Sequence, residues 1–141
     1  MPRADFYLID KPRFREQPLL LVCELAKRGY AANLSILVLA RDTAQAEAID
    51  DLMWSFDPDE YLPHQIAGMD EGDDDTPILI ATPDMDIPAR PMLLNLRDAA
   101  PTGSFERVLE VVPADPSARG PLRERWKHYQ SLGFDVNKHD M

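Results

Sequence analysis

The stretch Leu34-Ser35-Ile36-Leu37-Val38-Leu39-Ala40, residues 34–40, decides the fold class of this chain. Its centre, from Ile36 to Leu39, is continuously apolar, which predicts the central strand of a parallel sheet, buried on both faces. A helix is expected directly after it, because Asp42 or Thr43 can cap a helical N-terminus. The apolar stripe of that helix would comprise Ala46, Ile49, Met53 and Trp54.

Elements of the same kinds are expected on the N-terminal side of this strand. Residues 5–10 form a short apolar run with polar ends, typical of a buried strand, and a loop with Pro12 follows. Pro18 can occupy the first turn of a helix that runs to Arg28, with Gly29 as its C-terminal cap.

On the C-terminal side, residues 57–75 are expected to be mostly loop. Three further strand candidates, residues 77–81, 92–96 and 107–112, are followed by a basic helix. Strands that alternate with helices predict an α/β fold. We therefore expect a single three-layer domain over residues 1–141, with a mainly parallel central sheet and helices on both faces.

Composition and charge narrow the classes of function. The chain has one cysteine and no apolar run of about eighteen residues, so neither an internal disulfide nor a membrane helix is expected. No signal peptide is visible, which favours a cytoplasmic protein. The formal net charge is -10, and this charge is unevenly distributed. The segment from Asp42 to Asp86 contains fourteen acidic residues and no Lys or Arg. An acidic chain is a poor candidate for direct DNA binding, whereas local basic patches can capture acidic partners.

Sequence motifs for catalysis, cofactors and metals do not assemble. No glycine-rich phosphate loop occurs, and the first expected strand leads instead into residues 11–15, Lys-Pro-Arg-Phe-Arg. The acidic segment 70–75 lacks the spacing of a calcium loop, and the three histidines are scattered. Cys23 lies among leucines in an expected helix. These patterns predict a protein that is not an enzyme and binds no cofactor or metal.

A basic and aromatic segment, residues 119–129, stands out against this acidic background. It carries four cationic side chains and one acid, and helical spacing puts Arg119, Arg123 and Trp126 on one face with Lys127 at its margin. Cations around an exposed indole could hold an acidic peptide with an aromatic end. On spacing alone, the favoured interpretation is a plain helix with Trp126 in the core and a solvated charged rim.

The segment Tyr61-Leu62-Pro63-His64 is a second candidate for an interface. It lies in an expected loop, where an aromatic side chain next to a rigid proline is typical of an interface anchor. An interpretation of equal weight is that Tyr61 packs back over the preceding helix.

Short motifs in a fixed order run along nearly the whole chain. They are Phe6-Tyr7-Leu8-Ile9-Asp10, Cys23-Glu24, Gln45-Ala46, Leu52-Met53-Trp54, residues 61–68, Leu94-Asn95-Leu96, residues 105–113, residues 123–129 and Gly133-Phe134. In order and spacing they resemble the chi subunit of bacterial DNA polymerase III.

The resemblance implies a non-catalytic accessory subunit of the clamp loader, with a fold similar to nucleotide-binding domains but without the nucleotide site. It also implies binding to the acidic C-terminal tail of single-stranded DNA-binding protein. By position, the tail pocket would comprise Val112, Arg119, Arg123, Trp126 and Lys127. The cations would take the tail's carboxylates, and Val112 with Trp126 would line the seat of its final aromatic ring.

The resemblance further implies that Tyr61, with Leu62, Pro63 and His64, contacts the psi subunit, or alternatively a repair helicase. Trp126 stands where the family commonly has tyrosine, and Tyr61 stands for a typical phenylalanine. Gly120-Pro121 could delay the start of the last helix to Pro121, which would leave Arg119 off its face. Direct single-stranded DNA binding through residues 119–127 is an alternative function, and a nucleotide-dependent enzyme is disfavoured by the missing phosphate loop.

Overall fold

The computed structural model describes residues 2–56, 62–68 and 75–141. In chain order the elements are β1 (Arg3–Leu8), α1 (Pro12–Glu16), α2 (Pro18–Ala31), β2 (Ile36–Leu39), α3 (Thr43–Ser55), β3 (His64–Ile66), β4 (Ile78–Ala81), β5 (Met92–Asn95), β6 (Arg107–Val112), the 3-10 helix η2 (Pro116–Ala118), α4 (Arg119–Ser131) and β7 (Asp135–Asp140).

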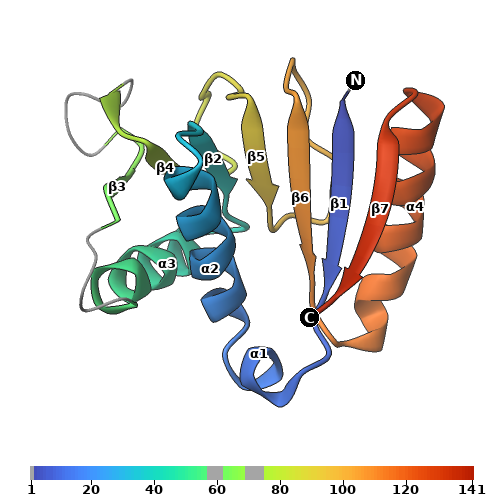
Figure 1. Cartoon of the computed structure of the whole chain (residues 1–141), viewed down its shortest axis with the longest axis horizontal. Helices are drawn as coiled ribbons and strands as arrows, with labels where there is room; N and C mark the ends of the chain where they lie inside the picture. The colour runs from blue at the N-terminus through green and yellow to red at the C-terminus, as the bar shows by residue number, and fades with distance from the viewer. Residues whose placement is uncertain (1, 57–61, 69–74) are drawn as a thin grey trace.

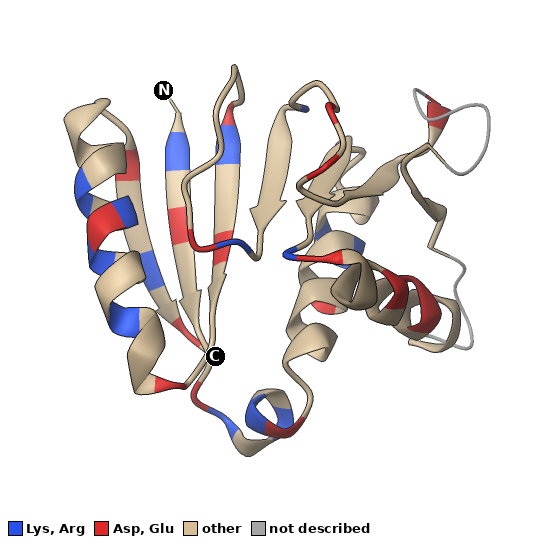
Figure 2. Cartoon of the chain, turned by 180° about the vertical axis from the view of Figure 1, so that it is seen from behind, with Lys and Arg blue, Asp and Glu red and all other residues tan. Residues whose placement is uncertain are grey.

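The strands of the described residues form one seven-stranded sheet in the order β3-β4-β2-β5-β6-β1-β7. Every neighbouring pair is parallel. Helices α2 and α3 cover one face of the sheet, and α4 covers the other face behind β7 and β1 (Figures 1 and 2). The predicted three-layer α/β architecture with a parallel sheet is confirmed.

The centre of the sheet is buried from both sides. All four residues of β2 are buried: Ile36 and Val38 pack in the core under α2 and α3, while Leu37 and Leu39 pack in the core on the α4 side. The continuous apolar run therefore reflects a strand with protein on each face, as predicted. The predicted cap is also confirmed, because the Asp42 side chain accepts a hydrogen bond from the Gln45 backbone N–H at 2.7 Å.

Two local predictions in the first third of the chain were wrong. The expected loop with Pro12 is the short helix α1, which begins at that proline. Gly29 is not a cap but a buried residue inside α2, and a Cβ there would lie 2.5 Å from Ile36 Cδ1. Its small size therefore lets α2 approach β2, and the left-handed residue after the helix is Asn33, with φ 61°.

Two strands were not anticipated. The three-residue β3 lies inside the segment expected to be mostly loop and pairs with β4 at one edge of the sheet. The polar β7 forms the opposite edge and pairs with β1 along its whole length. Among the helices of the described residues, none has both the length and the apolar character needed to cross a bilayer.

Candidate functional site

A cavity of about 710 Å³ lies beside α4 at the carboxyl ends of β1 and β6. This end of a parallel sheet is where ligands bind in open α/β folds. All five residues that the resemblance assigns to a tail pocket line this one cavity: Val112, Arg119, Arg123, Trp126 and Lys127. We call it the α4 cavity.

The α4 cavity has an apolar floor built on the sheet. Val112, the last residue of β6, is 3% exposed. The indole of Trp126 is half-buried, and its ring centroid lies 5.1 Å from that of Phe6, a fully buried residue of β1. Trp126 is thus part of the core and part of the cavity wall, so the two interpretations of this residue do not exclude each other.

The cations of α4 stand along one side of this floor. Arg119, Arg123 and Lys127 are spaced four residues apart, so they share one face of the helix, and all three are exposed. None of the three forms an ion pair with another described residue, whereas Arg125 on the same helix does. Figure 2 shows Lys and Arg positions as blue bands along the helix beside β7, which is α4. Uncompensated charge next to an apolar floor suits an anionic ligand with an apolar part.

Arg119 belongs to the helix, contrary to the suggested start at Pro121. Helix α4 begins at Arg119, and Gly120 and Pro121 occupy its first turn. Backbone N–H groups of the first turn have no partner within a helix, so a proline is tolerated there. The preceding η2 is held by Asp115, whose side chain accepts from the Ser117 N–H at 2.9 Å and whose pKa is lowered by that contact.

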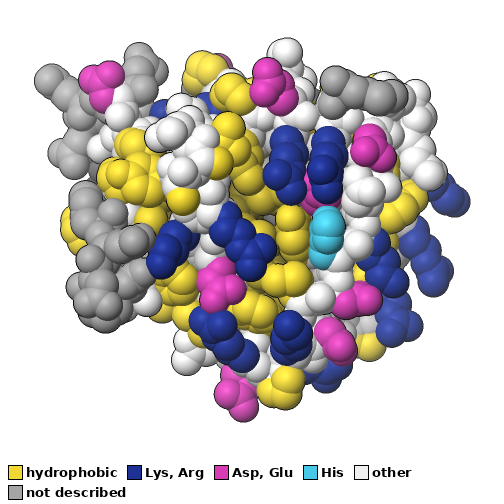
Figure 3. All heavy atoms as spheres, viewed as in Figure 1, with side chains coloured by type: hydrophobic (Ala, Val, Ile, Leu, Met, Phe, Trp, Pro, Cys, Tyr) yellow, Lys and Arg dark blue, Asp and Glu magenta, His cyan; other side chains and the backbone are white. Residues whose placement is uncertain are grey.

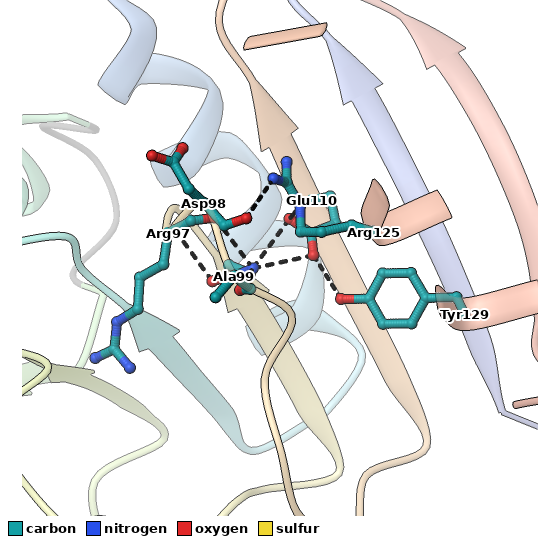
Figure 4. A network of polar contacts seen from close by, with 7 residues as sticks. Arg97, Asp98, Ala99, Glu110, Arg125 and Tyr129 are labelled. Atoms are coloured by element: carbon teal, nitrogen blue, oxygen red, sulfur yellow. Dashed lines mark hydrogen bonds and ion pairs between the residues drawn. The ribbon is translucent and has the colours of Figure 1, made fainter. Parts of the chain in front are cut away.

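A buried polar network fixes α4 against the sheet (Figure 4). Glu110 of β6 is fully buried and accepts hydrogen bonds from Arg125 Nε at 3.1 Å and from the Tyr129 hydroxyl at 2.5 Å. Asn95 Nδ2 of β5 donates to both carboxylate oxygens of Glu110. Arg125 also donates to the Asp98 carbonyl at 2.9 Å, which ties the loop after β5 to the helix.

Burial dominates the protonation behaviour of this network. It raises the pKa of Glu110, although the guanidinium of Arg125 and the hydrogen bonds from Tyr129 and Asn95 act in the opposite direction. Burial and the neighbouring Glu110 also raise the pKa of Tyr129. Glu110 is not among the residues that the sequence predicts for the site. The available signal was one acid inside the apolar strand Val108-Leu109-Glu110-Val111-Val112.

A second cluster of polar side chains lies on the same sheet face as α2 and α3, over strands β1, β6 and β7, which these two helices leave open (Figure 1). Asp5 of β1 is fully buried and accepts from Arg3 at 3.1 Å, from Arg107 at 2.8 Å and from His139 Nε2 at 2.9 Å. Figure 3 shows basic side chains and one histidine gathered on this face. Burial by itself raises the pKa of Asp5, but the hydrogen bonds from His139, Arg3 and Arg107 outweigh it and hold that pKa below its ordinary value.

The other predicted interface lies near β3, at the far edge of the sheet. Tyr61 is outside the described residues. Leu62 and His64 are buried, at 1% and 6% exposure, and Pro63 is half-buried. The His64 ring lies between the Leu62 carbonyl, 2.6 Å from Nδ1, and Asp50, whose Oδ1 is 3.2 Å from Nε2.

Among the described residues of this region, the exposed aromatic side chain is Trp54. It was predicted to belong to the buried stripe of α3, but it is 59% exposed, whereas Ala46, Ile49 and Met53 are buried as predicted. Its ring packs edge-on against His64 with centroids 4.8 Å apart. We call Trp54 and Pro63, above buried His64, the Trp54 surface.

Potential metal ligands were compared over the described residues. Across the part of the chain that the structure describes, no three His, Cys, Asp or Glu side chains could hold a metal together. Burial raises the pKa of the Cys23 thiol to about 12, so this thiol is neutral at physiological pH.

Comparison with known proteins adds to this geometry. The family model of the DNA polymerase III chi subunit, HolC, matches residues 1–137. Curated chi subunits from Pseudomonas aeruginosa and Escherichia coli are 29% and 31% identical, covering 99% and 97% of this chain and 96% and 97% of their own lengths. One from Haemophilus influenzae is 29% identical over 83% of each chain.

A solved structure shows the fold alone. The crystal structure of the E. coli DEAD-box protein SrmB bound to regulator of ribonuclease activity A superposes with a TM-score of 0.60 at 15% identity, covering 100% of this chain and 92% of that one.

The match of the family model over almost the entire length is supported by the curated relatives at about 30% identity. The chain therefore belongs to the family of chi subunits of DNA polymerase III, accessory subunits of the bacterial replication machinery.

Proposed function

We propose that this chain binds the acidic C-terminal tail of single-stranded DNA-binding protein in the α4 cavity, acting as a non-catalytic adaptor in the cytoplasm. The observation that carries the proposal is the arrangement of Arg119, Arg123 and Lys127 on one helical face above a floor made by Val112 and Trp126. A tail with acidic residues and an apolar end matches both parts of this surface.

The chemistry of recognition follows from the two halves of the cavity. Guanidinium and ammonium groups form charge-assisted hydrogen bonds with carboxylates, and arginine can do so with two parallel bonds. A terminal aromatic ring can pack on the indole of Trp126, which Phe6 holds in place from below. The Glu110 network keeps α4, and therefore its cations, at a fixed distance from the floor.

The Trp54 surface is the proposed contact for the psi subunit, through which the chain would connect to the clamp loader. A large exposed aromatic side chain is the type of residue that carries much of the binding energy at interfaces. A repair helicase could use the same surface. The Trp54 surface and the α4 cavity lie at opposite edges of the sheet, so both partners could bind at once.

A fluorescence titration tests the tail proposal. In a Trp54→Phe background Trp126 is the one remaining tryptophan, and an acidic peptide ending in Phe should change its emission. Arg123→Ala should weaken binding by about 1.5–3 kcal/mol, the range for a hydrogen bond to a charged group. Affinity should also fall with added salt.

The controls define what would contradict the proposal. Arg28→Ala removes an exposed arginine from α2 that does not line the cavity, and it should bind as the parent does. A bare oligonucleotide should not bind. If emission stays unchanged, or if Arg123→Ala binds like Arg28→Ala, the tail does not occupy the α4 cavity.

A further inference from the structure

The α4 cavity contains two cations that neither the resemblance nor helical spacing singled out. Arg15 comes from α1, which lies beyond the carboxyl ends of the strands (Figure 1), and Lys138 comes from the edge strand β7. Lys138 is in register with Phe6, so its side chain projects from the same sheet face as Phe6, toward α4. The cavity is therefore bordered by positive charge on more than one side.

Both side chains retain capacity for a ligand. The Arg15 Nε donates to the Asp10 backbone carbonyl at 2.7 Å. The contact between Arg15 Nη2 and the Asp10 carboxylate is long, at 3.5 Å, and the side chains of Arg15 and Asp10 are each more than half exposed. A pair of this kind in solvent is weak and can be exchanged for another carboxylate. Lys138 is exposed and forms no ion pair with any residue that the structure describes.

The charges around the cavity do not cancel. Five cationic and three acidic side chains line it, in a chain whose formal net charge is -10. The cations fall into two groups, three on α4 and two on α1 and β7, and the apolar floor with Val112 and Trp126 belongs to the same cavity.

We propose that Arg15 and Lys138 form a second cationic wall, and that the ligand is an extended peptide whose neighbouring acidic residues are divided between this wall and α4. The inference rests on the proposed tail binding and specifies how the tail is read. In an extended chain, successive side chains point to opposite sides, so two adjacent acids cannot both face α4. A second wall gives the other acid a partner of opposite charge.

This arrangement selects a chemical class of peptide. A peptide with at least two consecutive acids before its apolar end satisfies both walls. A peptide with one acid leaves a wall without a partner and binds more weakly. Because these pairs stay partly exposed to water, each cation of the second wall contributes modestly.

Double-mutant cycles test the inference. The peptides are an acidic peptide ending in Phe and two versions in which one or the other of two adjacent Asp residues is replaced by Asn. Binding of each is measured to the parent, Arg15→Ala, Lys138→Ala and Arg123→Ala proteins, all in the Trp54→Phe background. Arg15→Ala and Lys138→Ala should each weaken binding of the parent peptide about threefold, and about tenfold together.

The coupling between each Asp of the peptide and each arginine of the protein shows whether the acids are divided between the two walls. When the Asp that faces the second wall is replaced by Asn, Arg15→Ala should no longer weaken binding, whereas Arg123→Ala still should. When the neighbouring Asp is replaced, Arg123→Ala should no longer weaken binding, whereas Arg15→Ala still should. Arg13→Ala is the matched control, because Arg13 lies on the same short helix, pairs with Glu24 at 2.7 Å and does not line the cavity. Thermal unfolding checks that each variant is folded.

The outcomes separate this inference from the proposed function. Failure of the parent protein to bind the parent peptide overturns the proposed function. If the parent binds and Arg123→Ala weakens binding, but Arg15→Ala and Lys138→Ala behave like Arg13→Ala, only the second wall is overturned. Coupling of the same Asp to both Arg15 and Arg123 overturns the division of neighbouring acids.

Discussion

Arg125 and Glu110 form an ion pair between the α4 helix and the centre of the sheet, with Nε 3.1 Å from Oε1 and side-chain exposures of 7% and 0%. The pair lies on the hidden side of the helix that presents Arg123 and Lys127 to the cavity. The position of the cationic face therefore depends on a contact between two residues that do not line the cavity.

Glu110→Gln should destabilise the protein by about 3 kcal/mol, because it leaves the guanidinium of Arg125 buried without its counter-charge. Chemical denaturation followed by circular dichroism measures the change in the free energy of unfolding. Glu106→Gln, at an exposed position shortly before β6, is the matched control and should stay within about 0.5 kcal/mol of the parent. Equal stability of the two variants would show that the pair does not hold α4.

Asp5→Asn should lower stability at neutral pH by about 1–2 kcal/mol, a discounted value because the three donors to Asp5 reach solvent. The pKa of Asp5 is lowered in the folded protein, so its contribution is present above the unfolded pKa of about 3.9 and is lost as the pH falls below it. The stability difference between parent and variant should therefore shrink as the pH falls below about 4.

Urea unfolding at a series of pH values measures this difference. Asp86→Asn, which changes an exposed aspartate, should show no such trend. A gap between parent and Asp5→Asn that widens as the pH falls below about 4 would mean that the cluster raises the pKa of Asp5 instead of lowering it.

Gly29→Ala should destabilise the protein by about 1 kcal/mol, because overpacking against Ile36 Cδ1 outweighs the better helix propensity of alanine. Ile36→Val removes the atom that is 2.5 Å from the new Cβ, so the double variant should be more stable than the sum of the single changes predicts. Gly120→Ala in α4 meets nothing within 4 Å and should be neutral or slightly stabilising. Thermal unfolding is measured for the parent, Gly29→Ala, Ile36→Val and the double variant. Strictly additive changes in stability would show that the new Cβ at position 29 does not clash with Ile36.

Trp54→Ala and Arg123→Ala should each lose a different partner. In a pull-down with psi and single-stranded DNA-binding protein, Trp54→Ala should retain the latter and lose psi, and Arg123→Ala should do the opposite. The two residues lie on α3 and α4, which pack on opposite faces of the sheet. Loss of the same partner from both variants would contradict a model with two separate surfaces.

Features set by a few neighbouring residues could be predicted from the sequence. The doubly buried β2 follows from its continuous apolar run, and Asp42 caps α3 because a carboxylate stands three residues before a free N–H. The five residues that the resemblance assigns to a tail pocket line one cavity, and their role in binding a tail stays a prediction.

Features set by distant parts of the chain could not be predicted. Strand β7 is mostly polar, and it is a strand because the entire length of β1 offers it hydrogen bonds. Trp54 is exposed because, of the residues that α3 carries, the sheet and α2 cover Ala46, Ile49 and Met53 but not Trp54. Arg15 lines the cavity because residues 12–16 form the helix α1, whereas the sequence predicts a loop there.

The register of β1 with β6 on one side and β7 on the other has a consequence for the order of events during synthesis. The cavity needs residues 8–15 together with residues 112–140, which leave the ribosome far apart in time. Strand β1 must therefore wait, with its apolar side chains unpaired, until residues 107–140 have emerged. Contacts of such long sequence separation form slowly, so the α4 cavity is complete only after residue 140 has left the ribosome.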